Sequence, residues 1–164
     1  MDLRVFNNLP EADAAAVLRP CLDVERWITS LVAARPYANS AGLTAAAQQS
    51  AASFSESEIS AALAHHPRIG ERASGNSAEA SLSRGEQASL NLDGDVTSRL
   101  AEANRSYEAR FNRVFLIRAA GRSTNEILAE CERRLDNDDD TELREVAEQL
   151  RAIALLRMSS AVSD

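Results

Sequence analysis

The two histidines of this 164-residue chain, His65 and His66, stand side by side and are followed at once by Pro67. A residue before proline is driven toward extended backbone, so a helix that reaches this point should stop here. His66 could then direct its imidazole into a pocket, where a pKa near neutrality suits proton transfer. Alternatively, it could bind the last carbonyls of the helix and the negative end of the helix dipole. The pattern leaves both interpretations open.

A second set of polar residues, Ser83-Arg-Gly-Glu86, matches the S-x-x-E capping box. In that motif the serine side chain accepts from a backbone N–H at the start of a helix, and the glutamate reaches back to the serine N–H. We therefore expect Ser83 and Glu86 to begin a helix. A capping box also fixes the position of a carboxylate, so this structural role is compatible with a catalytic one.

Arg157 falls on the apolar side of the last predicted helix. At about 100° per residue, it shares one arc with Leu143, Val146, Ala147, Leu150, Ile153 and Ala154. A guanidinium on a core-facing stripe cannot be left unpaired without a large cost. It could extend past the helix end into solvent, pair with a carboxylate, or present its planar fork of donors to an anionic or carbonyl-bearing ligand. All three remain open.

Two patterns that could indicate metal binding do not support it. The acidic run from Asp136 to Asp140 resembles a calcium loop, but Thr141 stands where the loop needs glycine and Ala147 where it needs a bidentate glutamate. We expect a polar turn whose last aspartate caps the next helix. Cys21 and Cys131 lie far apart, which indicates neither a disulfide framework nor a four-ligand zinc site. Two buried thiols in a reducing compartment are expected, and no metal site.

The elements that must position these residues should be helices. Alanine, leucine, glutamate and arginine dominate, whereas valine, isoleucine and aromatic residues are few. The length favours a single domain over residues 1–164, and the composition an all-α one. Turn signals and apolar periodicity predict about eight helices, at 11–18, 24–34, 43–52, 57–65, 85–90, 96–110, 125–135 and 141–159. The longest loop is expected at 68–81, with two glycines among small polar residues.

Net charge narrows the classes of partner. The formal charge of -7 disfavours nucleic acid and anionic membranes, which are bound largely through clustered lysine and arginine. The N-terminus does not combine a basic start with an apolar run, and no stretch approaches the ~20 apolar residues of a membrane span. We therefore expect a soluble, cytoplasmic protein.

Taken in order, several short motifs resemble one enzyme family. The segments are H-P-R-I-G-E at 66–71, S-x-x-E-Q at 83–87, N-x-x-Y-E-x-R-F at 104–111, F-L-I at 115–117, G-R-S at 121–123, E-I-L at 126–128, R-L-x-N-D at 134–138 and L-R at 156–157. Their order and spacing resemble the 2-oxo-4-hydroxy-4-carboxy-5-ureidoimidazoline (OHCU) decarboxylases of urate breakdown, over nearly the whole chain. One departure is Asn112, where the family commonly has glycine. Asparagine tolerates left-handed backbone better than most residues, so the loop shape alone is affected.

This resemblance implies an all-helical, often dimeric enzyme that needs no cofactor and forms S-allantoin and carbon dioxide from a small-molecule substrate. The family's catalytic histidine falls on His66, its site serine and glutamate on Ser83 and Glu86, and its substrate-binding arginine on Arg157. The resemblance also implies that Pro67 and the backbone of Phe115, Leu116 and Ile117 help to hold the substrate.

Two rival functions remain open. The histidine, serine and arginine could all be structural parts of a helical interaction module. The same scaffold could also carry a different small-molecule lyase or hydrolase, because a fold does not determine a function. A turnover assay separates the enzyme from the interaction module.

Overall fold

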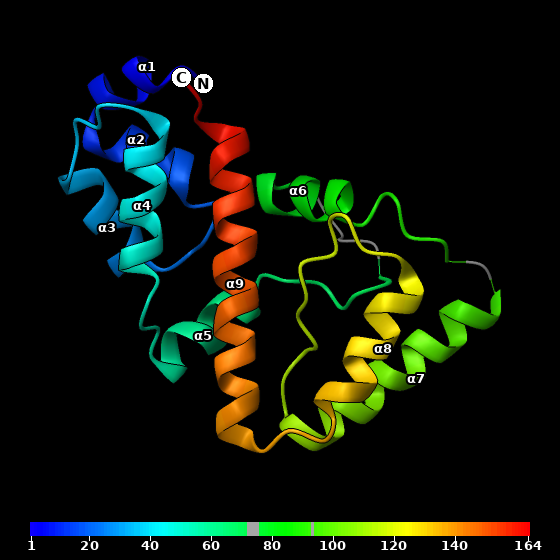
Figure 1. Ribbon diagram of the computed structural model, residues 1–164. Coiled ribbons are helices and arrows are strands. Elements are labelled where there is room, and N and C mark those ends of the chain that lie inside the picture. Colours follow the sequence, from blue (N-terminus) through cyan, green and yellow to red (C-terminus); the bar gives the residue numbers. More distant parts are fainter. Residues whose placement is uncertain (72–75, 93) are drawn as a thin grey trace. The chain divides into compact units, whose positions relative to one another are not determined.

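A computed structural model of the protein describes residues 1–71, 76–92 and 94–164. Its contacts divide the chain into two units, of which the first holds residues 1–62 and 151–164 and the second residues 63–150. Within the described ranges the chain forms nine helices, and its β structure is a single bridge between Asp2 and Ser163. The prediction of an all-α protein is confirmed (Figure 1).

The first unit is built from the N-terminal helices and the end of the last one. It holds α1 (Leu3–Asn8), α2 (Glu11–Leu18), α3 (Glu25–Ala33), α4 (Ser40–Ser50), most of α5 (Glu56–Leu63) and the C-terminal part of α9 (Asp139–Ala161). Helix α3 packs against both α2 and α4. On α3, the fully buried Trp27 donates its indole N–H to the Ala47 carbonyl of α4 at 3.1 Å. The two termini lie side by side, with the Leu3 N–H bonded to the Ser163 carbonyl at 2.8 Å (Figure 1).

The second unit contains α6 (Ala78–Glu86), α7 (Gly94–Phe111), α8 (Thr124–Arg134) and the start of α9. Helices α7 and α8 pack side by side (Figure 1). Their apolar faces pack against the irregular segments that precede and follow them. The resulting core contains Ile69, Leu90, Leu100, Ala103, Tyr107, Phe111, Phe115, Ile117, Ala119, Ile127, Leu128 and Cys131.

Most predicted helices are present with ends shifted by a few residues, and α2 has the predicted bounds. Helix α1 was not predicted. It has six residues, too few to show a helical repeat of apolar positions. Its start is marked by Asp2, whose carboxylate accepts from the Arg4 N–H at 2.8 Å.

The helix predicted at 85–90 is wrong. Helix α6 begins at Ala78, where the Ser77 hydroxyl accepts from the Ala80 N–H at 3.1 Å, and it ends at Glu86. Ser83 and Glu86 therefore lie near the C-terminal end of α6, and the capping box predicted for them is also wrong. The expected loop at 68–81 ends earlier than predicted, because α6 begins at Ala78, and its residues 72–75 lie outside the described ranges.

Capping boxes form at two other S-x-x-E sites, both at true helix starts. Ser55 precedes α5 and exchanges hydrogen bonds with Glu58, at 2.8 Å from the Ser55 N–H and 3.2 Å from the Glu58 N–H. Ser123 and Glu126 do the same at the start of α8, at 2.6 and 3.2 Å. The motif therefore caps only where the serine side chain faces the open N–H groups of a first turn.

The acidic run before α9 forms a polar turn, as predicted, but the predicted capping residue is wrong. Helix α9 begins at Asp139, and the Asp138 carboxylate accepts from the Thr141 N–H at 2.7 Å. That hydrogen bond lowers the pKa of Asp138. The cap is therefore Asp138, because Asp140 already lies inside the helix.

Both cysteines are buried free thiols, as predicted, one in each unit. Burial raises the pKa of Cys21 and of Cys131 to about 11. Across the described ranges, the structure brings no three histidine, cysteine, aspartate or glutamate side chains together as metal ligands would be. Of the helices in those ranges, none is both long enough and apolar enough to span a membrane.

Candidate active site

His66 lies in a backbone break, as the sequence predicts. Helix α5 ends at Leu63, and the His66 N–H donates to the Leu63 carbonyl at 3.0 Å, which closes a turn. His66 then leads into Pro67 in non-helical backbone. Its side chain is half-buried, whereas that of His65 is exposed. Of the two histidines, His66 is therefore the one with partial shelter from solvent.

The chain that follows Pro67 is fastened at three consecutive residues. Arg68 forms a two-pronged ion pair with Glu108 of α7, at 2.5 and 2.8 Å. The Ile69 carbonyl accepts from the Asn104 side-chain amide at 2.9 Å, and the Gly70 N–H donates to the Gln87 side chain at 2.8 Å. The hydrogen bond from Arg68 lowers the pKa of Glu108. The backbone immediately after His66 is thus held by α7 and by the residue that follows α6.

Gly70 is required by its surroundings. Its φ is +86°, in the left-handed region, and an added Cβ would lie 2.7 Å from Cδ2 of Leu100. Any side chain here would be strained and would push into the α7 surface. The glycine of H-P-R-I-G-E therefore lets the loop lie directly on α7.

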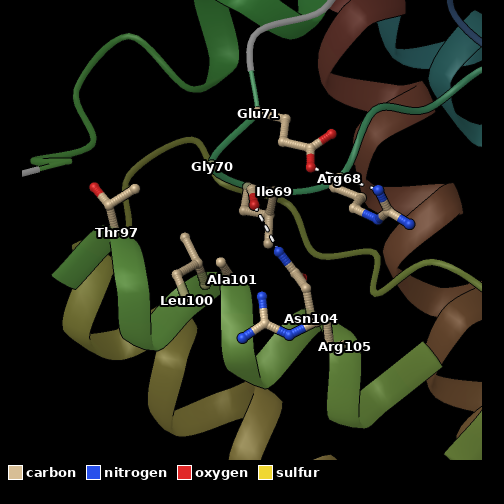
Figure 2. A pocket seen from close by; sticks show the side chains of 9 residues that line it. All are labelled: Arg68, Ile69, Gly70, Glu71, Thr97, Leu100, Ala101, Asn104 and Arg105. Carbon is tan, nitrogen blue, oxygen red and sulfur yellow. Dashed lines mark hydrogen bonds and ion pairs between the residues drawn. The ribbon is translucent and has the colours of Figure 1, made fainter. Parts of the chain in front are cut away.

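Two clefts lie beside this loop. The first, about 290 Å³, runs between Arg68–Glu71 and α7; Figure 2 shows the loop residues facing Thr97, Leu100, Ala101, Asn104 and Arg105. The second, about 330 Å³, is lined by Gly70, Glu71, Arg84, Gln87, Ala88, Leu90 and Leu92. The lining of the second cleft includes residues at the end of α6, where the S-x-x-E-Q motif lies. Neither lining includes His66, Ser83 or Glu86.

Ser83 and Glu86 occupy the C-terminal end of α6. Ser83 is buried, with 3% of its surface exposed, and Glu86 is half-buried. A buried serine hydroxyl and a half-buried carboxylate have the polarity expected of a site rather than of a solvated cap. The bond between Gly70 and Gln87 connects this end of α6 to the loop after His66. The structure thus fastens two of the predicted motifs to each other.

Phe115, Leu116 and Ile117 form an irregular buried segment after α7, with exposures of 1%, 4% and 5%. The Leu116 carbonyl accepts from Arg134 of α8 at 2.8 Å. Within the described residues of this unit, the N–H groups of the three residues donate no main-chain hydrogen bond. Buried main-chain groups are nearly always paired, so these N–H groups are candidate donors to a polar ligand.

The sequence did not identify a buried polar cluster beside this segment. Arg134 and Glu142 are both fully buried, and their side chains are joined at 2.9 and 2.5 Å. The Tyr107 hydroxyl donates to the same carboxylate. Two motif segments, N-x-x-Y-E and R-L-x-N-D, contain Tyr107 and Arg134. Glu142 carried no signal, because it follows an acidic run that indicates exposure.

Arg157 lies in the first unit and is buried, with 4% of its surface exposed. One guanidinium nitrogen donates to the Pro20 carbonyl at 3.2 Å. The side chain therefore does not extend past the helix end into solvent, which removes one of the three interpretations of the sequence. Val146, Leu150, Ile153 and Ala154 of the predicted stripe are also buried.

The backbone at Asn112 shows why the family that the sequence resembles commonly has glycine at this position. Its φ is +53°, so it adopts the left-handed conformation just after α7. Its N–H donates to the Glu108 carbonyl at 2.8 Å and closes the helix. Asparagine tolerates this conformation better than other non-glycine residues, so the shape that glycine would allow is kept.

Comparison with known proteins identifies similar chains. A family model described as OHCU decarboxylase matches residues 7–159. A 2-oxo-4-hydroxy-4-carboxy-5-ureidoimidazoline decarboxylase from Haloferax volcanii is 29% identical over 99% of this chain and 97% of its own.

Two solved structures share the fold. A crystal structure of an OHCU decarboxylase in the presence of (S)-allantoin has a TM-score of 0.70 and 23% identity, over 87% of this chain and 94% of that one. A crystal structure of (S)-allantoin synthase has a TM-score of 0.72 and 16% identity, over 99% of this chain and 54% of that one.

Proposed function

We propose that this chain, which belongs to the OHCU decarboxylase family, converts OHCU to (S)-allantoin and carbon dioxide in urate breakdown. One observation carries the proposal beyond family membership. The loop after His66 is bonded at successive residues to α7 and to Gln87, all within motifs of the family. Three of the family's motifs are therefore bonded to one another next to the candidate catalytic histidine.

The reaction places modest demands on a protein. When the carboxylate leaves as carbon dioxide, the C–C bond breaks and its electron pair forms a C=C bond to the carbon that bears the ureido group, while the π electrons of the ring C=N bond move onto nitrogen, which takes up a proton. The carbon that carried the carboxylate then loses its hydroxyl proton and becomes a carbonyl, and a proton is added to the carbon that bears the ureido group. The ring itself accepts the electrons, so the enzyme must position the substrate, bind its charge and deliver a proton.

We assign these tasks to the predicted site residues. His66 transfers the proton to one face, which sets the S configuration, and its partial burial before Pro67 supports this role. Glu86 accepts from substrate N–H groups and orients them, with Ser83 beside it in the same helical turn.

Substrate binding is assigned to Arg157 and to the main chain. The planar guanidinium of Arg157 suits a carboxylate or a pair of carbonyl oxygens. Pro67 fixes the backbone behind His66, and the Phe115–Ile117 segment offers N–H groups. Its burial and its lack of main-chain partners within the described second unit support that assignment.

The remaining expectations complete the proposal. Residues 1–164 act as a single decarboxylase domain, which is supported by a family match that spans both units. The enzyme works without a cofactor, as a homodimer in the cytoplasm.

A turnover assay with freshly generated OHCU tests the function. The purified protein should remove OHCU faster than buffer does and should yield dextrorotatory (S)-allantoin, whereas the uncatalysed reaction drifts to the racemate. Activity should survive a chelator. Racemic product at the buffer rate would remove the decarboxylase proposal in favour of an interaction module or another enzyme, and loss of activity with chelator would remove its cofactor-free part.

A further inference from the structure

The Leu116 carbonyl is held by a buried ion pair that the proposed reaction does not use. Arg134 donates to this carbonyl at 2.8 Å through one terminal nitrogen. Its other nitrogens contact Glu142, at 2.9 Å from Nε and 2.5 Å from the second terminal nitrogen. Both residues are fully buried. A buried ion pair loses the solvation of both charges, so it is tolerated only where geometry and further hydrogen bonds compensate.

Further partners complete the cluster. The Tyr107 hydroxyl donates to one oxygen of the Glu142 carboxylate, and the Asn137 amide donates to the other at 2.9 Å. The guanidinium of Arg134 also lies over the Phe115 ring, 4.7 Å from its centroid. Arg134 therefore contacts the 115–117 segment twice, at the Leu116 carbonyl and at the Phe115 ring.

Electrostatics fix the protonation of Arg134 and of Tyr107. Burial alone would lower the pKa of Arg134, but the hydrogen bonds and charge of Glu142 outweigh it, so the pKa is raised. Burial and the bond to Glu142 raise the pKa of Tyr107. Neither group exchanges a proton near neutral pH, which fits a fixed support better than an acid or a base.

We propose that Arg134 is a positioning residue: fixed by Glu142 and Tyr107, it holds the Leu116 carbonyl so that the other main-chain groups of residues 115–117 face the substrate. The inference rests on the proposed function, in which this segment binds substrate. A second contact supports it, because the Arg118 N–H donates to the Gln149 side chain of α9 at 2.9 Å. The segment is thus held at two neighbouring points by side chains of α8 and α9.

The test compares Arg134→Lys with Arg133→Lys. Lysine keeps the charge, but a single ammonium cannot reproduce the fork that reaches Glu142 and Leu116 together. Arg133 is a matched control, since it also forms two-pronged ion pairs, with Glu130 and Glu145, but is exposed and has no bond to the segment. Tyr107→Phe removes one hydroxyl from the cluster and serves as a milder variant should Arg134→Lys fail to fold.

Two readouts separate positioning from general stability. In Arg134→Lys we expect KM for OHCU to rise about tenfold or more. We expect a smaller change in kcat, which is calculated per folded enzyme. Amide hydrogen exchange in a peptide covering residues 112–119 should accelerate about tenfold. Tyr107→Phe should change both quantities in the same direction, and Arg133→Lys should change neither.

The outcomes are distinguishable. If Arg134→Lys has a lower melting temperature but wild-type KM and wild-type exchange at 112–119, Arg134 is a structural residue only. If the lysine variant does not fold, the same result in Tyr107→Phe leads to the same conclusion. Inactive wild-type protein would remove the proposed function and with it the substrate-facing role. The exchange measurement would still show whether Arg134 holds the segment.

Discussion

The Asn104 side-chain amide donates to the Ile69 main-chain carbonyl at 2.9 Å, across 35 positions of sequence. Asn104 is buried in α7, and Ile69 lies three residues after His66. Three contacts fasten the loop, at Arg68, Ile69 and Gly70. The contact at Ile69 is the one in which donor and acceptor are both neutral and buried. It ties the backbone beside the candidate catalytic histidine to the most extensive helix packing of the second unit.

Asn104→Asp should weaken this connection without changing side-chain size. The carboxylate has no N–H to donate and faces the Ile69 carbonyl, so a buried acceptor is left unpaired at a cost of about 1–3 kcal/mol. Thermal unfolding should show the loss, and turnover should fall with it. Asn125→Asp, on the exposed side of α8, is the control and should leave both unchanged. Equal stability of the two variants would mean that the loop does not depend on Asn104.

His66→Ala should abolish turnover, whereas His65→Ala should not. The two residues are neighbours, but only His66 is partly buried and precedes Pro67, while His65 is exposed in the turn. Steady-state kinetics and the optical rotation of the product measure the difference. Similar losses in the two variants would contradict the assignment of His66, since they would point to a shared structural role.

The limits of sequence interpretation show in two cases. The stripe on α9 was predicted correctly down to Arg157, because a periodic pattern over several turns averages out local exceptions. By contrast, the S-x-x-E pattern at Ser83 is only four residues long and occurs equally well inside a helix. What decided its role was the cap at Ser77, six residues earlier.

The sequence also contained no indication that the charged side chain of Glu142 would be buried. An acidic run before Glu142 indicates solvent exposure, and the local sequence contains nothing to the contrary. Glu142 is buried because Arg134 and Tyr107, from two other helices, supply its partners. Such a pair can be recognised only when both partners are known to meet, which a single sequence does not reveal.

Asn112 should be replaceable by glycine but not by a β-branched residue. Its φ of +53° is favourable for glycine, tolerable for asparagine and strained for valine. We expect Asn112→Gly to unfold at nearly the wild-type temperature and Asn112→Val to lose about 1–3 kcal/mol. Chemical denaturation provides the measurement. A valine variant as stable as the wild type would show that the backbone relaxes out of this conformation.

Stability should fall between pH 9 and pH 11. Burial raises the pKa of both thiols from 9.0 to about 11, so the folded state binds protons that the unfolded state releases. The stabilisation is fully present below pH 9 and is lost as the pH rises toward 11, by up to about 1.4 kcal/mol per pH unit for each thiol. The chain has no lysine, but Tyr37 and Tyr107, whose pKa values burial also raises, add to the loss of stability in this range. Denaturation at several pH values should give a shallower slope for Cys131→Ser; an unchanged slope would contradict burial as the cause.

Arg157→Lys distinguishes the two remaining interpretations of this arginine. Lysine keeps the charge and can still donate to the Pro20 carbonyl, but it lacks the planar fork. If Arg157 binds substrate through two prongs, as we propose, KM should rise or kcat fall by about tenfold, or 1.4 kcal/mol. The melting temperature should stay nearly constant.

Two further variants complete this test. Arg151→Lys is the matched control, since Arg151 also lies on α9 and donates to a main-chain carbonyl, that of Ala51 at 3.1 Å. It should keep wild-type kinetics. Arg157→Ala tests the rival role in a structural ion pair, where a buried carboxylate left unpaired would lower stability by about 3 kcal/mol or more. Wild-type kinetics in Arg157→Lys, together with such a loss in Arg157→Ala, would make Arg157 a structural residue and require another group to bind the substrate carboxylate.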